Sequence, residues 1–377
     1  MSRFVGVRRA ALGIASAVMA LALLGCAANK PKPTPLEIFQ PKASARQVWS
    51  ASIGSIGSSM VPTLRGGTYF VAASDGTVAA FDAETGAERW RTRISGEVSA
   101  GVGSDGRFTS VVTRGNEVVT LDAGREIWRK RLTSRVVTPP LVAGERVFVI
   151  GVDRAVQAFD AVDGRRLWTL QRPGDALTLA QASVINAFGN NLLVGQGSRL
   201  TAVDPLRGTV VWDISMASPR GTNEVERLAD LIGPAVRVGD RLCARAFQSA
   251  VACADVAKGS LLWSRNVGGY NAVGSDADLV FGADATDRVT AWRAATGDVA
   301  WTTEKYLYRR LSGAIALGSN VVFGDFEGYL HFLASSNGEP VLRLPTDGSA
   351  VVGTPVASGG TLLVATKRGG LFAFRAQ

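Results

Sequence analysis

Histidine is nearly absent from this sequence: among 377 residues there is one, His331, and cysteine occurs three times. A single imidazole excludes any site built on two, such as a histidine-rich zinc site. A Ser-His-Asp triad would depend on His331, which lies in the apolar, strand-like run YLHFL, where a structural role is the better interpretation. The sequence also lacks a G-x-S-x-G elbow, a phosphate loop, a Cys-x-x-Cys pair and a calcium-loop pattern. We therefore expect no catalytic residue, no metal site, no cofactor and no enzymatic activity.

Long hydrophobic runs are missing as well, apart from one near the N-terminus. Three arginines precede an uncharged stretch at residues 10–24. This arrangement is typical of a secretory signal and is too short for the roughly 20 residues of a spanning helix. The stretch ends in LLGC, which resembles the lipobox where a bacterial lipoprotein signal is removed and the cysteine is acylated. We predict a signal peptide at residues 1–25 and a lipid on Cys26; an ordinary signal with an incidental cysteine is the alternative.

The charge balance is only mildly basic. Cleavage of the signal removes three arginines and no acidic residue, so the formal charge falls from +9 to +6. There is no dense Lys/Arg cluster, so we expect no nucleic-acid partner; the charge suits solubility or an acidic partner surface. Residues 26–45 contain four prolines, a composition typical of an extended linker. They are predicted to be a tether between the lipid and a folded domain at residues 46–377.

One ten-residue motif recurs through that domain. It reads FDAETGAERW at residues 81–90 and returns as FDAVDGRRLW, VDPLRGTVVW, ADVAKGSLLW and WRAATGDVAW. A shortened copy, LDAGREIW, ends at Trp128, and a degraded copy, LASSNGEPVL, ends at Leu342. Seven of the eight tryptophans occupy the last motif position or, at Trp49, its equivalent, at intervals of 38 to 51 residues. Such self-similarity at a period near 40 residues indicates a repeat fold.

Each period contains four short β-like runs separated by turn signals. In the first repeat these are residues 59–64, 68–73, 77–82 and 88–94. Asp75-Gly76 is expected to form a two-residue hairpin turn, because such a turn needs positive φ at both positions. The D-x-x-T-G segment is expected to form the next turn. Four strands in about 40 residues are typical of a β-propeller blade.

The two ends of the chain are predicted to complete one another. The last repeat supplies runs at residues 351–357, 361–366 and 371–375 but no tryptophan-bearing strand. The run RQVWSA at residues 46–51 has that strand's character and no blade of its own. We therefore predict an all-β fold: an eight-bladed β-propeller of four-stranded antiparallel blades, its ring closed by an N-terminal strand that completes the last blade. Closure removes open sheet edges that would invite aggregation.

The motif resembles the tryptophan-docking motif of the propellers named for pyrroloquinoline quinone (PQQ) enzymes. In that family the tryptophan packs between neighbouring blades while the aspartate and glycine fix the turn; a tryptophan suits this because it buries roughly 150–250 Å². Arg293 replaces the aspartate in one repeat, and Ala334 and Leu342 replace the aspartate and tryptophan in the next, so we expect the weakest docking there. The resemblance assigns this structural role to Trp49, Asp82, Gly86, Trp90, Trp128, Asp160, Gly164, Trp168, Asp204, Gly208, Trp212, Asp255, Gly259, Trp263, Gly297 and Trp301.

Enzymes with this motif hold PQQ with an adjacent Cys-Cys pair and a calcium bound by carboxylates. Here nine residues lie between Cys243 and Cys253, an even separation of 10, and the two cysteines flank a hairpin whose turn falls near Gln248-Ser249. Directly opposed residues across a two-residue turn have an odd separation, so a disulfide needs a three-residue loop or a bulge. The sequence leaves both possibilities open, a disulfide and two buried thiols. A periplasmic PQQ-type enzyme or a carbohydrate-binding propeller is the alternative to a non-enzymatic role.

Two intervals between tryptophans are longer and carry inserts, GDALTLAQ and SPRGTNEVERLADL. Function in a propeller lies in such departures from the repeat, on loops of one face. A short helix is expected from Thr222 or Asn223 through Leu231. The alternative for Leu177 and Leu179 is that they fold back onto their own blades.

The inserts, the lipobox and the eight-blade count resemble the BamB family, lipoprotein propellers of the outer-membrane β-barrel assembly machinery; the segments GTNEVERLAD and GDFEGYLHFL carry the likeness. In that family, a Leu-x-Leu-Arg segment and an Arg-Leu-x-Asp-x-Asp segment dock on the periplasmic domains of the barrel subunit BamA. Leu177 and Leu179 match the first segment, and Arg227 and Asp230 match the second. A charged residue of each segment is replaced, by Ala180 and by Ile232.

The resemblance implies a non-enzymatic scaffold that holds BamA near the membrane and aids the folding and insertion of outer-membrane proteins. The implied partners are BamA and the rest of the assembly complex, and the membrane through the lipid. Direct contact with unfolded outer-membrane proteins and the blade edge involved are left open. Ala27, rather than aspartate, follows Cys26, which favours the outer membrane, with the propeller facing the periplasm.

Overall fold

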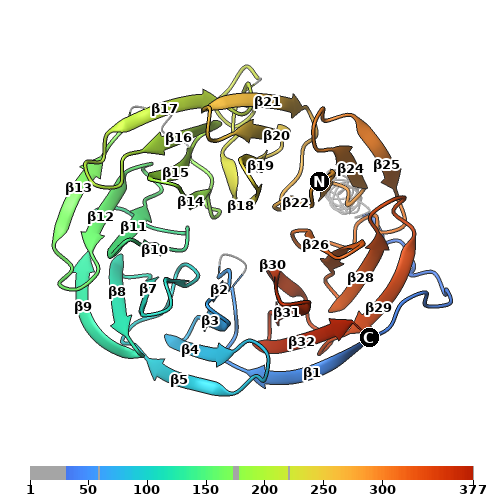
Figure 1. The fold of residues 1–377 in the computed structure, drawn as a ribbon, viewed down its shortest axis with the longest axis horizontal. Coiled ribbons are helices and arrows are strands. Elements are labelled where there is room, and N and C mark those ends of the chain that lie inside the picture. The colour runs from blue at the N-terminus through green and yellow to red at the C-terminus, as the bar shows by residue number, and fades with distance from the viewer. Residues whose placement is uncertain (1–30, 58–59, 173–177, 220, 377) are drawn as a thin grey trace, which may run out of the picture. The chain divides into compact units, whose positions relative to one another are not determined.

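The computed structural model describes residues 31–57, 60–172, 178–219 and 221–376, and it divides the chain into two units, residues 1–33 and Thr34–Gln377. The described residues of the second unit form 32 strands in eight four-stranded sheets, which are arranged as a ring of blades (Figure 1). Among the described residues there is no helix with the length and apolar character needed to cross a membrane. The predicted all-β, eight-bladed propeller is confirmed.

Each blade runs from an inner strand near the centre of the ring to an outer strand at its rim (Figure 1). Blades 1 to 4 consist of β2 (Thr63–Arg65), β3 (Thr68–Ala72), β4 (Thr77–Asp82) and β5 (Glu88–Arg93); β6 (Gly103–Ser104), β7 (Phe108–Val112), β8 (Glu117–Asp122) and β9 (Arg125–Arg131); β10 (Leu141–Ala143), β11 (Arg146–Ile150), β12 (Val156–Asp160) and β13 (Arg166–Leu170); and β14 (Ile185–Phe188), β15 (Asn191–Gln196), β16 (Arg199–Val203) and β17 (Val210–Ser215). Blades 5 to 8 consist of β18 (Leu231–Val238), β19 (Arg241–Ala246), β20 (Ala250–Asp255) and β21 (Ser260–Arg265); β22 (Gly274–Ser275), β23 (Leu279–Ala283), β24 (Val289–Arg293) and β25 (Val299–Thr303); β26 (Ile315–Leu317), β27 (Asn320–Gly324), β28 (Tyr329–Ala334) and β29 (Pro340–Pro345); and β30 (Val351–Ser358), β31 (Thr361–Thr366), β32 (Gly370–Ala376) and β1 (Ala45–Ser52).

The ring closes through the two ends of the chain. Strand β1 pairs antiparallel with β32, from Ala45 opposite Ala376 to Ser52 opposite Gly370. Figure 1 shows the two strands side by side at the rim, one from each end of the colour scale. The predicted completion of the last blade by an N-terminal strand is confirmed.

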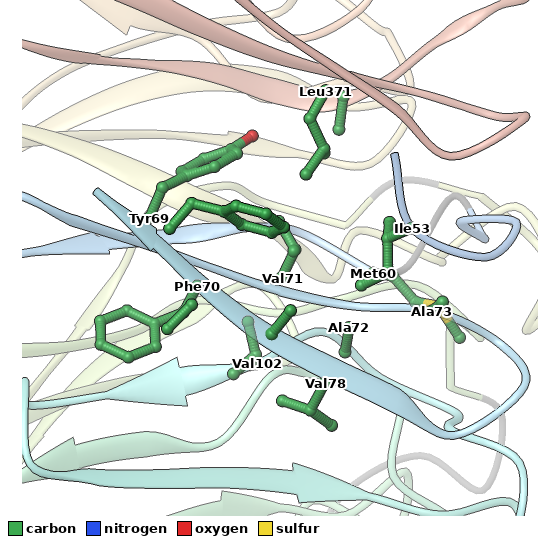
Figure 2. Close-up of a cluster of buried hydrophobic side chains, with 14 of the residues drawn as sticks. Ile53, Met60, Tyr69, Phe70, Val71, Ala72, Ala73, Val78, Val102 and Leu371 are labelled. Atoms are coloured by element: carbon green, nitrogen blue, oxygen red, sulfur yellow. The ribbon is translucent and has the colours of Figure 1, made fainter. Parts of the chain in front are cut away.

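The core lies between the blades. All five residues of β3 are buried, because this strand is covered by a neighbouring blade on each face. In Figure 2 the side chains of β3 lie between Leu371 of blade 8 and Val102, which leads into blade 2. A strand without a solvent face carries a continuous apolar run rather than an alternating one. The outer strand β5, by contrast, is largely exposed.

The hairpin between β3 and β4 is longer than the sequence suggested. The amide of Ala73 donates to the carbonyl of Thr77 (2.8 Å), which leaves three residues, Ser74, Asp75 and Gly76, in the loop. Of these three, Gly76 alone has positive φ, 93°. Asp75 accepts a hydrogen bond from the amide of Thr77 (3.0 Å) instead of adopting a left-handed conformation. The prediction of a two-residue turn is wrong; this is a three-residue loop ending in a left-handed glycine.

Candidate functional site

The motif tryptophans join each blade to the next. Each indole lies against the glycine of the motif turn in the following blade, so closely that a Cβ on that glycine would be 2.5–3.0 Å from the ring. The pairs in the described residues are Trp49–Gly86, Trp90–Gly124, Trp128–Gly164, Trp168–Gly208, Trp212–Gly259, Trp263–Gly297 and Trp301–Gly338. In five of these described pairs the indole N–H also donates to a carbonyl of the same turn, as Trp128 does to Ala161 (2.8 Å).

The altered repeats keep this contact. Trp263 donates to the carbonyl next to Arg293 (2.9 Å), and Trp301 donates to the carbonyl next to Ala334 (2.7 Å). The expected weakening at these two junctions is therefore not seen in their hydrogen bonds. The reason is that the indole contacts the backbone of the turn, and that backbone persists without the aspartate: the amide of Gly297 still donates to the carbonyl of Arg293 (2.7 Å).

The motif aspartate stabilises the turn in which it lies. One carboxylate oxygen of Asp82 accepts hydrogen bonds from the amides of Glu84 and Thr85, at 3.1 and 3.0 Å. The Arg89 guanidinium, together with the Thr85 amide and hydroxyl, holds the pKa of Asp82 well below its usual range. These aspartates stabilise exposed turns and are not available as a shared ligand set. Among the described residues, no group of three or more His, Cys, Asp or Glu side chains could hold a metal ion.

Asp230 connects the two inserts. It lies just before β18, and one of its carboxylate oxygens accepts the amide of Leu179 (2.7 Å), in the loop between β13 and β14. The other oxygen accepts the Arg154 guanidinium (3.2 Å), from the loop between β11 and β12. The side chains of Arg154 and Asp230 are only 16% and 14% exposed. The carboxylate is therefore an internal link among loops of three blades.

Two other predicted docking residues, Leu179 and Arg227, lie in the two inserts that this link joins. Leu179 is half-buried, and Arg227 is exposed in the second insert. Ala180 is exposed, whereas Ile232 is buried in β18, so its side chain offers nothing to a partner. Leu177 and the predicted lipid site Cys26 lie outside the described residues.

The second insert forms a single turn rather than a helix. The Asn223 side chain accepts the amide of Glu226 (2.9 Å), and the Glu226 carboxylate accepts the amide of Thr222 (2.8 Å). These reciprocal bonds resemble a helix-capping box. The chain does not continue as a helix, because Ala229 and Leu231 are buried in the core of blades 4 and 5. The predicted helix is wrong.

Two aromatic residues, Phe247 and Tyr270, lie next to the loops that Asp230 joins. The amide of Phe247 donates to the carbonyl of Asp230 (2.9 Å), and the Gln181 side chain donates to the carbonyl of Tyr270 (2.6 Å). The rings of Phe247 and Tyr270 are 5.9 Å apart, and Tyr270 is 46% exposed. The loop before β14 is thus bound on one side to Asp230 and on the other to the loop before β22.

Arg245 fixes the loop that carries Tyr270, and sequence reasoning missed it. It is completely buried in β19, and its guanidinium donates to the carbonyls of Val267, Asn271 and Ala283 at 3.0, 2.9 and 2.8 Å. Burial lowers the pKa of Arg245 to about 10. The sequence feature that could have identified Arg245 is its position in the middle of a run otherwise made of small and apolar residues.

A disulfide lies in the same blade. Cys243 and Cys253 are directly opposed in β19 and β20 and are bonded, with their Cα atoms 4.1 Å apart. The loop between the strands has three residues, and its middle residue, Gln248, has φ of 49°. This is the longer loop that an even separation requires. The bond links β19, which carries Arg245 and leads into Phe247, to its neighbour β20.

The N-terminal segment lies along blade 7. The amide of Thr34 donates to the carbonyl of Leu307 (2.9 Å), and the amide of Lys42 donates to the carbonyl of Val341 in β29 (2.8 Å). Arg343 donates to the carbonyl of Glu37 (3.1 Å) between these points. From Thr34 onward, the predicted tether is therefore bound to the propeller rather than free.

His331 has structural partners in this blade. It is 1% exposed in β28, with its Nε2 2.9 Å from a carboxylate oxygen of Asp325. The same oxygen accepts two hydrogen bonds from the Arg309 guanidinium (2.8 and 2.7 Å). The imidazole of His331 is therefore part of a buried charged cluster with Asp325 and Arg309.

Comparison with known proteins agrees with this architecture. Residues 39–100 and 74–303 match the family model described as outer membrane protein assembly factor BamB. The protein of that name from Burkholderia pseudomallei is 35% identical over 376 residues, covering 98% of this chain and 99% of the relative.

Two solved structures share the fold. The crystal structure of BamB from Moraxella catarrhalis has a TM-score of 0.76 at 21% identity, covering 88% of this chain and 98% of that one. A quinohemoprotein alcohol dehydrogenase from Comamonas testosteroni has a TM-score of 0.67 at 16% identity, covering 88% and 76%. Because an enzyme shares the fold, the fold alone does not decide function. The full-length sequence relationship does decide the family: this chain belongs to the BamB family of outer membrane protein assembly factors.

Proposed function

We propose that this protein is a non-enzymatic scaffold of the outer-membrane β-barrel assembly complex, which docks on the periplasmic domains of BamA and thereby aids the folding and insertion of outer-membrane proteins. The observation that carries the proposal is the hydrogen bond from the Leu179 amide to Asp230 (2.7 Å), because it joins the two inserts into one surface through residues that are 51 positions apart. The relatives are named as assembly factors, in agreement with the predicted lack of enzymatic activity.

The residues of the proposed docking surface have different roles. Leu179 and, by sequence, Leu177 supply the apolar contact that a partner would cover. Asp230 is a positioning residue: its carboxylate holds the Leu179 loop and is itself held by Arg154. Arg227 is exposed and supplies charge at the rim, where it affects the rate of association more than its strength.

The docking proposal is tested by measuring the affinity of the purified full-length protein for the periplasmic domains of BamA from the same organism. Leu179→Ala is expected to raise Kd about tenfold or more, since a central apolar contact is worth about 1.4 kcal/mol or above. Asp230→Ala is expected to weaken binding similarly by releasing the loop, and to lower stability by about 1–3 kcal/mol, because the partly buried ion pair with Arg154 is lost.

Leu206→Ala is the matched control. Leu206 is 63% exposed in the motif turn of blade 4, away from the inserts, so its truncation should leave Kd within about twofold of the wild type. Wild-type affinity in Leu179→Ala would contradict this docking site. Absence of any binding by the wild type would contradict the function itself.

We also propose that the protein is attached to the outer membrane by a lipid on Cys26 and faces the periplasm. The LLGC sequence supports this. The chain contacts blade 7 from Thr34 onward, so seven residues, 27–33, separate Cys26 from the first of these contacts, and a chain of that length spans at most about 25 Å when extended. Cys26→Ser should lose labelling by radioactive palmitate and shift to the soluble fraction. Continued labelling of this variant would contradict the anchor.

A further inference from the structure

A cavity of about 480 Å³ lies beside the proposed docking surface. Its walls are parts of the innermost strands of several blades, the loops that lead into them and the loop between β31 and β32, so it opens toward the centre of the ring. The Leu179 loop contributes Ala180, Gln181 and Ala182 to one wall, and Tyr270 lies on the next. The cavity and the docking surface are therefore continuous.

The cavity wall carries positive charge alone. Arg310 and Lys367 are the charged residues among the described residues that line it, and no aspartate or glutamate is among them. Both side chains are exposed, and within the described parts of the chain neither forms an ion pair. Gln181, Asn271 and Ser312 add polar groups. Two unpaired cations over a concave surface favour an anionic occupant.

The loop that presents Arg310 is held in an unusual conformation. Arg310 and Tyr308 in this loop have positive φ, of 50° and 60°, as does Asp287 (67°) in the loop between β23 and β24 that contacts it; such a φ costs about 1–2 kcal/mol for a residue other than glycine. Such conformations persist where surrounding contacts impose them, and they cluster at functional sites. Here the Asp287 carboxylate imposes the conformation by accepting the amides of Arg310 (2.6 Å) and Leu311 (3.0 Å).

The walls are also bonded to one another across blades. The Asn271 side chain donates to the carbonyl of Leu311 (2.7 Å), and the Gln181 side chain donates to the carbonyl of Tyr270 (2.6 Å). The cavity is thus formed before any partner arrives, which lowers the entropic cost of binding. Its volume lies within the roughly 300–1,000 Å³ of ligand pockets, enough for a few side chains and too small for a folded domain.

We propose that this cavity receives an acidic loop of the protein that docks at the Leu179 surface, with a carboxylate of that loop placed between Arg310 and Lys367 and an apolar side chain beside Tyr270. The inference rests on the proposed function. It adds a second, electrostatic contact to the apolar one and gives the partner a defined orientation on the ring. It also assigns the exposed Tyr270 to the junction of the two contacts.

The test is a double charge reversal, Arg310→Glu with Lys367→Glu, in the full-length protein, with the periplasmic domains of BamA as the probe. The matched control is Arg131→Glu with Arg166→Glu, which makes the same charge change at exposed positions on the outer strands β9 and β13. We expect the first pair to raise Kd at least tenfold at about 0.1 M salt and the control to change it less than threefold. Wild-type affinity should fall with salt more steeply than that of the cavity variant.

The neutral pair Arg310→Gln with Lys367→Gln separates charge from misfolding and should weaken binding by an intermediate factor at an unchanged Tm. Wild-type affinity and salt dependence in the reversed pair would overturn the proposal, and so would weakened binding with an unchanged salt dependence. Inorganic phosphate that binds the wild type and not the reversed pair, with partner affinity unaffected, would assign the cavity to a small anion and overturn it too. If Leu179→Ala lost binding while the cavity variants bound normally, the cavity proposal would be wrong and the proposed function would still hold.

Discussion

Blades 3 and 7 are joined to the ring by different chemistry. The motif turn of blade 3 receives Trp128 on Gly164, and its own outer strand sends Trp168 to Gly208 in blade 4. Blade 7 receives Trp301, but its outer strand carries Leu342 where the other blades carry tryptophan. The following blade has no motif turn for an indole to contact, because its two outer strands, β32 and β1, are the two ends of the chain.

The difference shows what replaces the indole contact where the repeat cannot supply it. Leu342 packs in a cluster with Phe374 of β32. The N-terminal segment covers the same strand through the bond from Lys42 to Val341 (2.8 Å), and the buried cluster of Arg309, Asp325 and His331 lies within the blade. A regular junction therefore depends on one shape-matched contact, whereas the irregular one depends on an apolar cluster, on hydrogen bonds from the distant N-terminal segment and on a charged cluster within blade 7.

The largest expected effect is at the regular junction, from Gly164→Ala. Gly164 has φ of 70°, and a Cβ there would be 2.6 Å from the Trp128 ring, so the substitution both strains the backbone and displaces the indole. We expect a loss of about 2–4 kcal/mol in the free energy of unfolding, combining a left-handed alanine with overpacking. Urea unfolding followed by tryptophan fluorescence measures it.

Gly144→Ala is the control in the same blade. Gly144 also has positive φ, 58°, but a Cβ there meets nothing within 4 Å. Its cost should therefore be the backbone term alone, about 1–2 kcal/mol. Equal losses in the two variants would show that the indole contact does not hold the blades together.

The repeat made most of the fold predictable. Blade number, strand order and closure follow from the spacing of motif tryptophans and from the N-terminal run around Trp49, because each blade repeats the same local signals. The inserts carry no such periodicity. The link from Asp230 to Leu179 joins residues 51 apart, and the buried Arg245 acts on a loop more than 20 residues away, so the local sequence does not show what either side chain contacts.

Local signals also misled where packing decided the outcome. Asn223 and Glu226 provide the capping groups of a helix start, and these bonds do form. The chain forms only a turn and no helix, because the burial of Leu231 and the two hydrogen bonds to the Asp230 carboxylate fix the following backbone. The sequence contained the cap but not the contacts that oppose the helix.

The smallest expected effect is at the irregular junction and depends on pH. Asp325 accepts from His331 Nε2, which leaves Nδ1 buried without a hydrogen-bond partner among the described residues. Burial lowers the pKa of His331; Arg343 and Arg309 lower it further, and Asp325 opposes them. The unfolded chain therefore takes up this proton near pH 6.5 while the folded protein does not, so the free energy of unfolding falls as pH drops below 6.5.

The loss at pH 5.5 is bounded by the unfolded-state value and is at most about 1.4 kcal/mol. Because His331 is the only histidine, no other imidazole contributes. His331→Gln should flatten the dependence between pH 7.5 and 5.5 in urea unfolding. Burial raises the pKa of Asp287, which acts in the opposite direction, but this contribution is common to both proteins and cancels in their difference. Parallel curves would mean that the cluster of blade 7 tolerates a charged imidazole, and the contrast with blade 3 would then be one of shape alone.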